Sequence, residues 1–282
     1  MTRLLLTGAL GFTGRHFATA AHSAGHAVIP LTADLTDAAA VAAEVLAASP
    51  THVVHLAAIS AVTHAEEEAF YRVNLFGTLN LLKALAALPS SPEKVLLASS
   101  ANVYGNDEGG PIAETVCPKP VNHYAMSKLA MEHLAMTYAD SLPLVITRPF
   151  NYTGVGHDER FVIPKIMAHF KRLAPVIELG NLDVYREYND VRMVCDVYLR
   201  LLDRGVAGEI YNVCSVKTYA LREVITIAEE ITGHEMEVRV NPDFVRLNEI
   251  KTLAGSVEKL ESVIGPVVSI PLRQTLQWML EA

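Results

Sequence analysis

Residues 3–14 read RLLLTGALGFTG, an apolar run that leads directly into three glycines spaced three apart. The run at 3–7 predicts a buried β-strand, and Gly8, Gly11 and Gly14 predict a tight turn into a helix. Such a turn lets the backbone approach a pyrophosphate closely and offers it the free N–H groups of the helix start. A plain strand–helix turn is the alternative. The position at the first strand–helix junction favours a dinucleotide-binding site.

The alternation of strand and helix continues through the first half of the chain. Further apolar runs, which predict parallel strands covered on both faces, lie at 27–31, 52–58, 94–99 and 144–149. Helix-like stretches separate most of them, at 12–24, 37–48, 65–88 and 122–140. This order predicts an α/β fold with a Rossmann-like, doubly wound parallel sheet. Only TADLT separates the second strand from the next helix, so one strand and its crossover helix are expected to be shortened or lost.

The rhythm changes near residue 150, where the polar loop NYTGVGHDER begins. Later strands and helices are shorter, which predicts a smaller α/β substrate-binding lobe. The helix-like 191–204 and strand-like 209–214 are expected to return to the main sheet. The predicted dinucleotide-binding domain is therefore 1–150 plus about 184–214, and the predicted substrate lobe is about 151–183 and 215–282.

Composition excludes several classes of partner. A net charge of −8 disfavours nucleic acid and anionic lipid. The three cysteines are scattered without CxxC spacing, which argues for a reducing compartment and against a disulfide framework or a zinc site. No signal-peptide pattern opens the chain, and no apolar stretch reaches the ~18 residues of a membrane span. We therefore expect a cytoplasmic protein with no metal, no membrane and no nucleic-acid partner.

A second motif carries acid–base chemistry. In NHYAMSK, Tyr124 and Lys128 lie four positions apart in a predicted helix and share one face. An ammonium near a phenol is expected to lower the phenol's pKa from about 10 toward neutrality, so that it can exchange a proton beside a carbonyl. An exposed helix pair is the alternative for this motif alone. The stretch SSANVYG at 99–105 adds a pair of hydroxyls at the end of a strand, which makes coincidence a poor explanation.

The ordered set TGALGFTG, LAAISAV, VNLFGTLNLL, SSANVYG, YAMSK and RPFN resembles the extended short-chain dehydrogenases/reductases over essentially the whole chain. This is a family of nucleotide-sugar epimerases, dehydratases and reductases. The resemblance implies that Ser100 binds the substrate oxygen, Tyr124 is the acid/base and Lys128 orients the nicotinamide ribose of NADPH or NADH. The expected cofactor contacts are Gly8, Gly11, Phe12, Thr13, Gly14, Arg15, Asp34, Leu35, Ala57, Ala58, Tyr124 and Lys128.

The choice between NADH and NADPH stays open at this stage. Asp34 lies twenty positions beyond Gly14, where an acidic residue binds the adenosine ribose, although the shortened crossover allows an adenine contact instead. Asp37 is expected to cap the next helix. No acidic residue ends the strand at 27–31, and no arginine sits there to bind a 2′-phosphate. Arg15 could bind that phosphate from the helix start, or it could be solvated.

The family's 4,6-dehydratases carry acidic residues directly after the catalytic serine or threonine. Here Ala101 and Asn102 occupy those positions, and neither transfers a proton, so dehydration is disfavoured. The stretches RPFNYTGVG, FVIPKI, LGNLDVYREYNDVR, YNVCS and VRLNEIKTLAGS are similar to the GDP-4-keto-6-deoxy-D-mannose reductases. That similarity implies hydride transfer to the C4 ketone of a GDP-linked deoxysugar, with GDP-D-rhamnose as the product.

The same similarity implies where the substrate binds. The expected substrate contacts are Ser60, Ser100, Asn102, Asn151, Lys165, Arg186, Arg246 and Glu249. Among them, Arg186 would grip the diphosphate as a guanidinium fork, and Arg246 and Glu249 would hold the nucleoside. The chain departs from the subgroup at His123 and Leu247, where proline is usual, and at Met193, where aspartate is usual.

Three alternatives stay open. A reductase that forms GDP-6-deoxy-D-talose differs only in the face of hydride delivery, which residue types do not reveal. A 4-epimerase acting on a nucleotide-diphosphate hexose would hold oxidised cofactor and need no added NAD(P)H. A non-catalytic dinucleotide sensor would be expected to lack part of the Ser100, Tyr124 and Lys128 set. In the family the helices matching 65–88 and 122–140 form a dimer interface, so a homodimer is expected.

Overall fold

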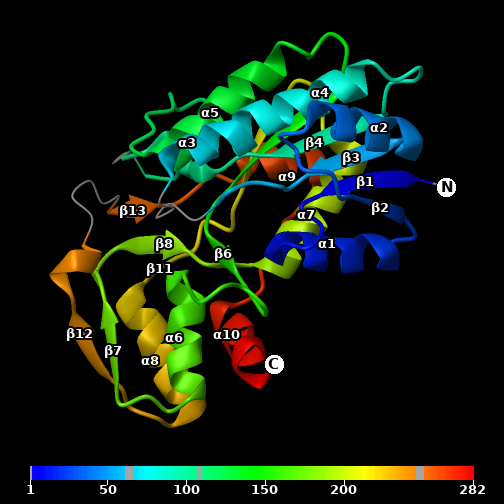
Figure 1. Ribbon diagram of the computed structural model, residues 1–282. Helices are drawn as coiled ribbons and strands as arrows, with labels where there is room; N and C mark the ends of the chain where they lie inside the picture. Colours follow the sequence, from blue (N-terminus) through cyan, green and yellow to red (C-terminus); the bar gives the residue numbers. More distant parts are fainter. Residues whose placement is uncertain (1, 61–65, 107–109, 246–250) are drawn as a thin grey trace.

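The computed structural model describes residues 2–60, 66–106, 110–245 and 251–282. Its centre is a six-stranded parallel sheet with the order β10-β5-β4-β3-β1-β2. Strands β1 to β4 of this sheet are labelled in Figure 1. The strands are β1 (Arg3–Thr7), β2 (Ala27–Leu31), β3 (His52–His55), β4 (Lys94–Ala98), β5 (Leu144–Pro149) and β10 (Ile210–Val213). The predicted Rossmann-like, doubly wound sheet is confirmed.

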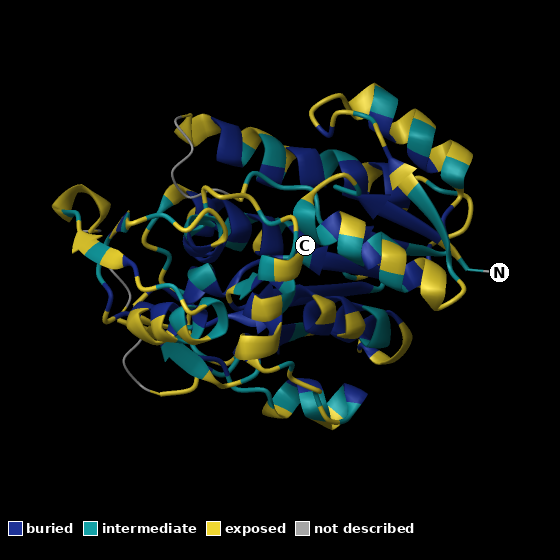
Figure 2. Ribbon diagram, turned by 90° about the horizontal axis from the view of Figure 1, so that it is seen from below, coloured by how far each residue is buried: buried dark blue, intermediate teal, exposed yellow. Residues whose placement is uncertain are grey.

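Helices cover both faces of this sheet because successive strand residues point to opposite sides. Leu4 and Leu6 face one layer and Leu5 faces the other. The first layer consists of α1 (Phe12–Ser23), α7 (Val191–Arg204) and α9 (Glu258–Ile264). The second consists of α2 (Ala38–Ala48), α4 (Thr78–Ala86) and α5 (His123–Met136). Figure 2 shows the strands as a buried centre between partly exposed helices.

Because the connection after β2 is short and adds no further strand beside it, β2 is the last strand at one edge of the sheet. Helix α2 carries the chain from β2 past β1 to β3, so the strand order reverses between β1 and β3. In open α/β sheets, ligands bind at the carboxyl ends of the strands at such a switch point. Strand β2 is left at the edge, where Pro30 is tolerated because an edge strand can do without one N–H donor.

Strand β3 is shorter than predicted, and the helix predicted at 65–88 is not continuous. Strand β3 stops at His55 rather than at 58, because the backbone N–H groups of Leu56 and Ala57 donate to Thr7 Oγ1 at 3.2 and 3.1 Å. The predicted helix 65–88 is divided into three segments. They are α3 (Glu67–Phe70), the π-helix η1 (Tyr71–Gly77) and α4.

The second part of the chain packs around its own apolar cluster, at the lower left of Figure 1. Its helices are α6 (Val162–Lys171), α8 (Leu221–Thr232) and α10 (Leu272–Glu281). Its small sheets pair β7 (Val176–Leu179) with β12 (Glu237–Val240), and β8 (Tyr185–Glu187) with β11 (Thr218–Ala220) and β13 (Thr252–Leu253). The remaining elements are β6 (Tyr152–Thr153), β9 (Asn189–Asp190), and the 3₁₀ turns η2 (Ala101–Tyr104) and η3 (Pro242–Phe244).

The predicted return to the main sheet takes place: β10 pairs with β5, and α7 packs against α1. The predicted domain boundaries assign α9 to the substrate lobe, but the structure places this helix beneath the main sheet. Leu260 and Ile264 of α9 are fully buried in the cluster beneath the main sheet. Packing against α7 and β10, rather than position in the sequence, decides where this helix belongs. None of the helices in the described ranges has the length and apolar character needed to span a bilayer.

Replacing Leu260 with alanine should lower the free energy of unfolding by about 2–5 kcal/mol, because it leaves a cavity beneath the main sheet. Chemical denaturation measures the loss. Val268→Ala is the matched control, since Val268 is 74% exposed and truncation at such a site changes stability by about 0.5 kcal/mol or less. Equal effects of the two substitutions would contradict the place of α9 in this core.

Candidate active site

The glycine turn between β1 and α1 forms a cradle that side chains would fill. Gly8 has φ +69°, and a Cβ there would lie 2.7 Å from the nitrogen of Ala57 at the end of β3. A Cβ on Gly14 would lie 2.0 Å from the carbonyl oxygen of Gly8. Gly11 is the N-cap of α1, and no side chain caps the helix there. The cradle lies at the switch point and fits the pyrophosphate of a dinucleotide.

The other predicted residues of α1 hold the loop that follows β6. Thr13 Oγ1 lies 2.8 Å from the hydroxyl of Tyr152. The Phe12 ring stacks on His157, with 4.2 Å between centroids and 7° between planes. Arg15 donates to the carbonyls of Leu10 at 2.9 Å and Gly156 at 3.2 Å. Arg15 is therefore directed toward this loop, as a link between the cofactor helix and the second part of the chain.

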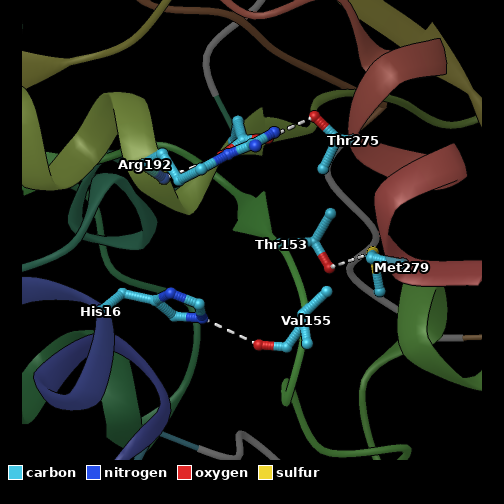
Figure 3. Close-up of polar contacts among 7 residues, drawn as sticks. His16, Thr153, Val155, Arg192, Thr275 and Met279 are labelled. Atoms are coloured by element: carbon cyan, nitrogen blue, oxygen red, sulfur yellow. Dashed lines mark hydrogen bonds and ion pairs between the residues drawn. The ribbon is translucent and has the colours of Figure 1, made fainter. Parts of the chain in front are cut away.

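Figure 3 shows further contacts at the same junction. His16 Nε2 lies 2.8 Å from the carbonyl oxygen of Val155. Asp190 pairs with Arg192 at 2.7 Å and accepts a hydrogen bond from Thr275 of α10 at 2.7 Å. The C-terminal helix and the loop after β6 are thereby attached to α1 and α7, the helices that pack beneath the main sheet.

The end of β2 carries more negative charge than the sequence indicated. Asp34 Oδ1 accepts hydrogen bonds from the N–H and the hydroxyl of Thr36, both at 2.8 Å, and these bonds lower the pKa of Asp34. Asp37 caps α2, as expected. Leu35 is buried in the core, so its side chain does not line this edge. Sequence reasoning missed Glu44 of α2, whose carboxylate accepts hydrogen bonds from the N–H and hydroxyl of Thr32 at 2.8 and 2.6 Å.

A buried amide holds the segment that contains Ala57, Ala58 and Ser60. Asn74, inside the π-helix η1, accepts from the N–H of Ile59 at 2.8 Å and donates to its carbonyl at 3.1 Å. Its amide nitrogen also lies 3.1 Å from Ser127 Oγ on α5. Asn74 therefore connects the segment after β3 to α5, the helix of Tyr124 and Lys128.

The ring of His55 links two threonine hydroxyls in the core. Its ring lies 2.7 Å from Thr7 Oγ1 and 2.9 Å from Thr78 Oγ1. Burial lowers the pKa of His55 to about 3, with a smaller contribution from the charge of Lys128, so the ring is neutral at pH 7. Within the described ranges, no three His, Cys, Asp or Glu side chains are grouped to hold a metal ion.

The three predicted catalytic residues meet where β4 ends and α5 begins. Tyr124, in the first turn of α5, is close enough to Ser100 for the serine side chain to lower the pKa of the phenol. Ser100 Oγ also accepts from the backbone N–H and side-chain amide of Asn102, at 3.2 and 3.1 Å. Lys128 Nζ donates to the carbonyl of Ala98 at 2.7 Å. All three side chains are buried.

Burial decides the protonation of this cluster. It raises the pKa of Tyr124, and the hydrogen bond with Ser100 offsets only part of the rise. Burial lowers the pKa of Lys128 to about 8, against the opposing charge of Glu132. The expected lowering of the tyrosine pKa by Lys128 was therefore wrong for the protein by itself. At neutral pH the phenol of Tyr124 holds its proton and can donate it.

A buried ion pair lies one turn beyond Lys128 and was missed from the sequence. Arg148 of β5 donates to Glu132 of α5 at 3.0 and 2.6 Å, and both side chains are nearly inaccessible. The hydroxyl of Ser99 also donates to Glu132. The guanidinium carbon lies 4.8 Å from the centre of the Tyr104 ring, whose hydroxyl donates to Asn212 at 2.7 Å. The pair thus joins the catalytic helix to two strands of the sheet.

Three of the predicted substrate residues, Asn151, Lys165 and Arg186, lie in the second part of the chain. Asn151 is exposed, and its carbonyl accepts from Asn189 at 2.9 Å. Lys165 donates to the carbonyl of Glu178 at 2.7 Å and lies 4.7 Å above the Phe244 ring. Arg186 donates to the carbonyl of Tyr185 at 2.8 Å. Ser60 is exposed. Arg246 and Glu249 lie outside the described residues.

The structure describes two of the three residues at which the chain departs from the subgroup. His123, in place of a proline, lies 2.9 Å from the hydroxyl of Tyr71 and 3.2 Å from the carboxylate of Glu67. Met193, in place of an aspartate, is buried in the core under the main sheet. Leu247 lies outside the described residues.

Replacing Arg148 with methionine should destabilise the protein by about 3–5 kcal/mol, because it leaves the Glu132 carboxylate buried without its cationic partner. Chemical unfolding measures the change. Arg160→Met is the matched control: Arg160 pairs with Asp158 on the surface, and exposed pairs contribute little. A loss no larger than that of the control would contradict a stabilising role for the buried pair.

Comparison with known proteins agrees with this geometry. The profile of the NAD dependent epimerase/dehydratase family matches residues 4–214. The GDP-6-deoxy-D-talose 4-dehydrogenase of Aggregatibacter actinomycetemcomitans is 35% identical over 268 residues, which cover 93% of this chain and 91% of that protein. The GDP-6-deoxy-D-mannose reductase of Pseudomonas aeruginosa is 35% identical over 293 aligned positions, which cover 99% of this chain and 96% of that protein.

A solved structure is similar over the same length. RMD from Pseudomonas aeruginosa complexed with NADPH has a TM-score of 0.92 and 34% identity, and the match covers 100% of this chain and 98% of that chain. The chain belongs to the NAD dependent epimerase/dehydratase family, and its resemblance to the extended short-chain dehydrogenases/reductases, as an NAD(P)-dependent oxidoreductase, is confirmed.

Proposed function

We propose that the protein reduces the C4 ketone of GDP-4-keto-6-deoxy-D-mannose with NADPH or NADH and forms GDP-D-rhamnose, as a step of deoxysugar biosynthesis. The observation that carries the proposal is the Tyr124–Ser100 pair with the amide of Asn102 beside it. No carboxylate stands at 101 or 102 to remove water from a sugar, so dehydration is disfavoured and hydride transfer at a single carbon is the supported chemistry. The GDP-deoxysugar relatives support this substrate class.

The reaction adds a hydride and a proton across one C=O bond. A reduced nicotinamide, when bound, would supply the hydride to the carbonyl carbon. Ser100 and Tyr124 hold the carbonyl oxygen by hydrogen bonds, which favour the negative charge that develops there. The phenol of Tyr124 gives its proton to that oxygen, so the alcohol leaves neutral and the protein holds a phenolate. Lys128 provides the nearby positive charge that stabilises the phenolate until it regains a proton from water.

The protonation described above suits this direction of reaction. A tyrosine whose pKa lies above its ordinary value of 10.0 keeps its proton at neutral pH. Such a group can act as a general acid, because it still carries the proton that it donates. Once a hydride has been added to the carbonyl carbon, the carbonyl oxygen is an oxyanion. This oxyanion is more basic than the phenolate, so the proton moves from Tyr124 to the sugar oxygen.

The second part of the chain would hold the nucleotide. We assign Asn151 and Lys165 to the sugar side of the cleft and Arg186 to the diphosphate, because a guanidinium fork matches phosphate oxygens. Arg246 and Glu249 are assigned to the nucleoside. In the bound protein Lys165 and Arg186 would exchange their present carbonyl acceptors for the substrate.

A homodimer is part of the proposal. Phe76 of η1 and Met126 of α5 are large apolar side chains that are 55% and 44% exposed. Segment η1 packs against α5, so the two side chains belong to one helical layer. The family resemblance implies that this layer meets its copy across a two-fold axis. The molar mass in solution tests this expectation.

Replacing Tyr124 with phenylalanine should lower kcat by about 10²–10⁴-fold, the usual loss when a general acid is removed. Cofactor affinity, measured by binding, should change little, because the aromatic ring remains. Tyr185→Phe is the control, since Tyr185 is exposed on a strand of the second part. Turnover of Tyr124→Phe near the normal rate would remove Tyr124 from the mechanism.

The pH profile gives an independent reading of the same cluster. Lys128 is charged below its pKa of about 8 and neutral above it. Reduction should therefore be fastest below pH 8 and should fall as the pH rises through that value. Tyr124 should keep its proton through this range, since its pKa lies above 10.0. A rate that is flat from pH 6 to beyond 10 would contradict this role of Lys128.

Incubation with GDP-4-keto-6-deoxy-D-mannose and NADPH or NADH tests the function itself. We expect loss of the reduced cofactor's absorbance and, by NMR, GDP-D-rhamnose as the product. GDP-6-deoxy-D-talose would keep the chemistry and change the stereochemistry, a result favoured by the likeness to the talose 4-dehydrogenase. Interconversion of a nucleotide-diphosphate hexose without added NAD(P)H would replace the proposal with a 4-epimerase.

A further inference from the structure

The end of β2 is placed where a Rossmann fold meets the adenosine ribose of its cofactor. Strands β1 and β2 run parallel, with Thr7 opposite Leu31. The next residues, Gly8 and Thr32, therefore lie side by side at the carboxyl edge of the sheet. Strand β2 is the edge strand and Thr32 is exposed. We therefore expect a group attached to the ribose 2′-oxygen to lie next to Thr32.

The carboxylate of Glu44 occupies this position. Its two oxygens accept from the N–H and the hydroxyl of Thr32, at 2.8 and 2.6 Å. These bonds lower the pKa of Glu44, so the group is ionised at neutral pH. A carboxylate has about four lone-pair sites. Thr32 engages two, the backbone N–H of Ala33 contributes a further and weaker hydrogen bond, and a remaining lone pair can accept from a ribose hydroxyl.

The charged groups near this edge do not favour a phosphate. Asp34 follows Thr32 by two positions and is ionised, with a pKa below its ordinary value. Arg15 is directed to the carbonyls of Leu10 and Gly156. Arg72 is near enough to lower the pKa of Asp34 and pairs with Glu66 at 3.6 Å. The charge on the β2 end itself is negative.

We propose that Glu44, positioned by Thr32, is a specificity-determining residue that makes this protein select NADH over NADPH. The carboxylate accepts the ribose 2′-hydroxyl of NADH and repels the 2′-phosphate of NADPH. The inference deepens the proposed function by naming its reductant, and it distinguishes this chain from RMD of Pseudomonas aeruginosa, which was solved with NADPH. It rests on the cofactor site alone and does not depend on the sugar.

The test is the affinity of the purified protein for NADH and for NADPH, measured by cofactor fluorescence without any sugar nucleotide. A phosphate of nearly two charges close to a solvated carboxylate should weaken binding by about tenfold or more. Glu44→Gln keeps an acceptor for Thr32 and removes the charge. We expect it to tighten NADPH binding by about tenfold while NADH binding stays within about threefold.

Three comparisons make the result specific. Glu93→Gln removes an exposed carboxylate just before β4, at the amino-terminal ends of the strands. This variant should leave the ratio of the NADH and NADPH affinities unchanged. The double variant Thr32→Arg with Glu44→Gln should reverse the preference toward NADPH, because arginine supplies a fork for the phosphate. In the unaltered protein, the preference should shrink as salt is raised from 0.05 to 0.5 M, since both charges are screened.

Equal or tighter binding of NADPH by the unaltered protein would overturn the proposal. So would a ratio that Glu44→Gln leaves unchanged, provided that the variant melts cooperatively. If that variant does not fold, the salt titration of the unaltered protein decides, and a preference for NADH that is independent of salt counts against a role for charge. Selective NADH binding without reduction of the GDP sugar would refute the proposed function and leave this inference standing.

Discussion

The buried pair between Glu132 and Arg148 is the interaction on which the catalytic end of the molecule depends. Two charges removed from water are stable only with close geometry and further hydrogen bonds, which restricts α5 to one position against β5. Ser99 donates to the same carboxylate, so the end of β4 is set by the same pair. Tyr124 in α5 and Ser100 just beyond β4 consequently lie close together.

The cofactor end relies on close packing instead of charge. Gly8 and Gly14 bring three backbone segments closer than any side chain would allow, and this places the start of α1 over the switch point. The side chains of Thr7 and Asn74 then hold the neighbouring segment at 56–59, because they accept hydrogen bonds from its backbone N–H groups. Both ends of the cleft thus lie on the same carboxyl edge of one sheet, as a hydride transfer between cofactor and ketone requires.

Much of this arrangement could be predicted from local patterns. Continuous apolar runs, glycine spacing and the Tyr124–Lys128 interval each depend on a few neighbouring residues, and the sheet and the meeting of Ser100 with Tyr124 followed from them. Three features could not be predicted in that way. The early end of β3 depends on Thr7, the place of α9 depends on α7 and β10, and the partner of Arg148 comes from another element. Each is a contact between segments far apart in the chain.

The amino-acid sequence by itself determined which groups can do chemistry: a phenol, a hydroxyl and an ammonium at intervals that fit one strand end and one helix face. Tertiary structure decided the state of those groups and the charge around them. Burial, which no interval records, raises the pKa of Tyr124 and lowers that of Lys128. The carboxylate beside Thr32 belongs to a residue twelve positions away, and only the packing of α2 along β2 brings the two together.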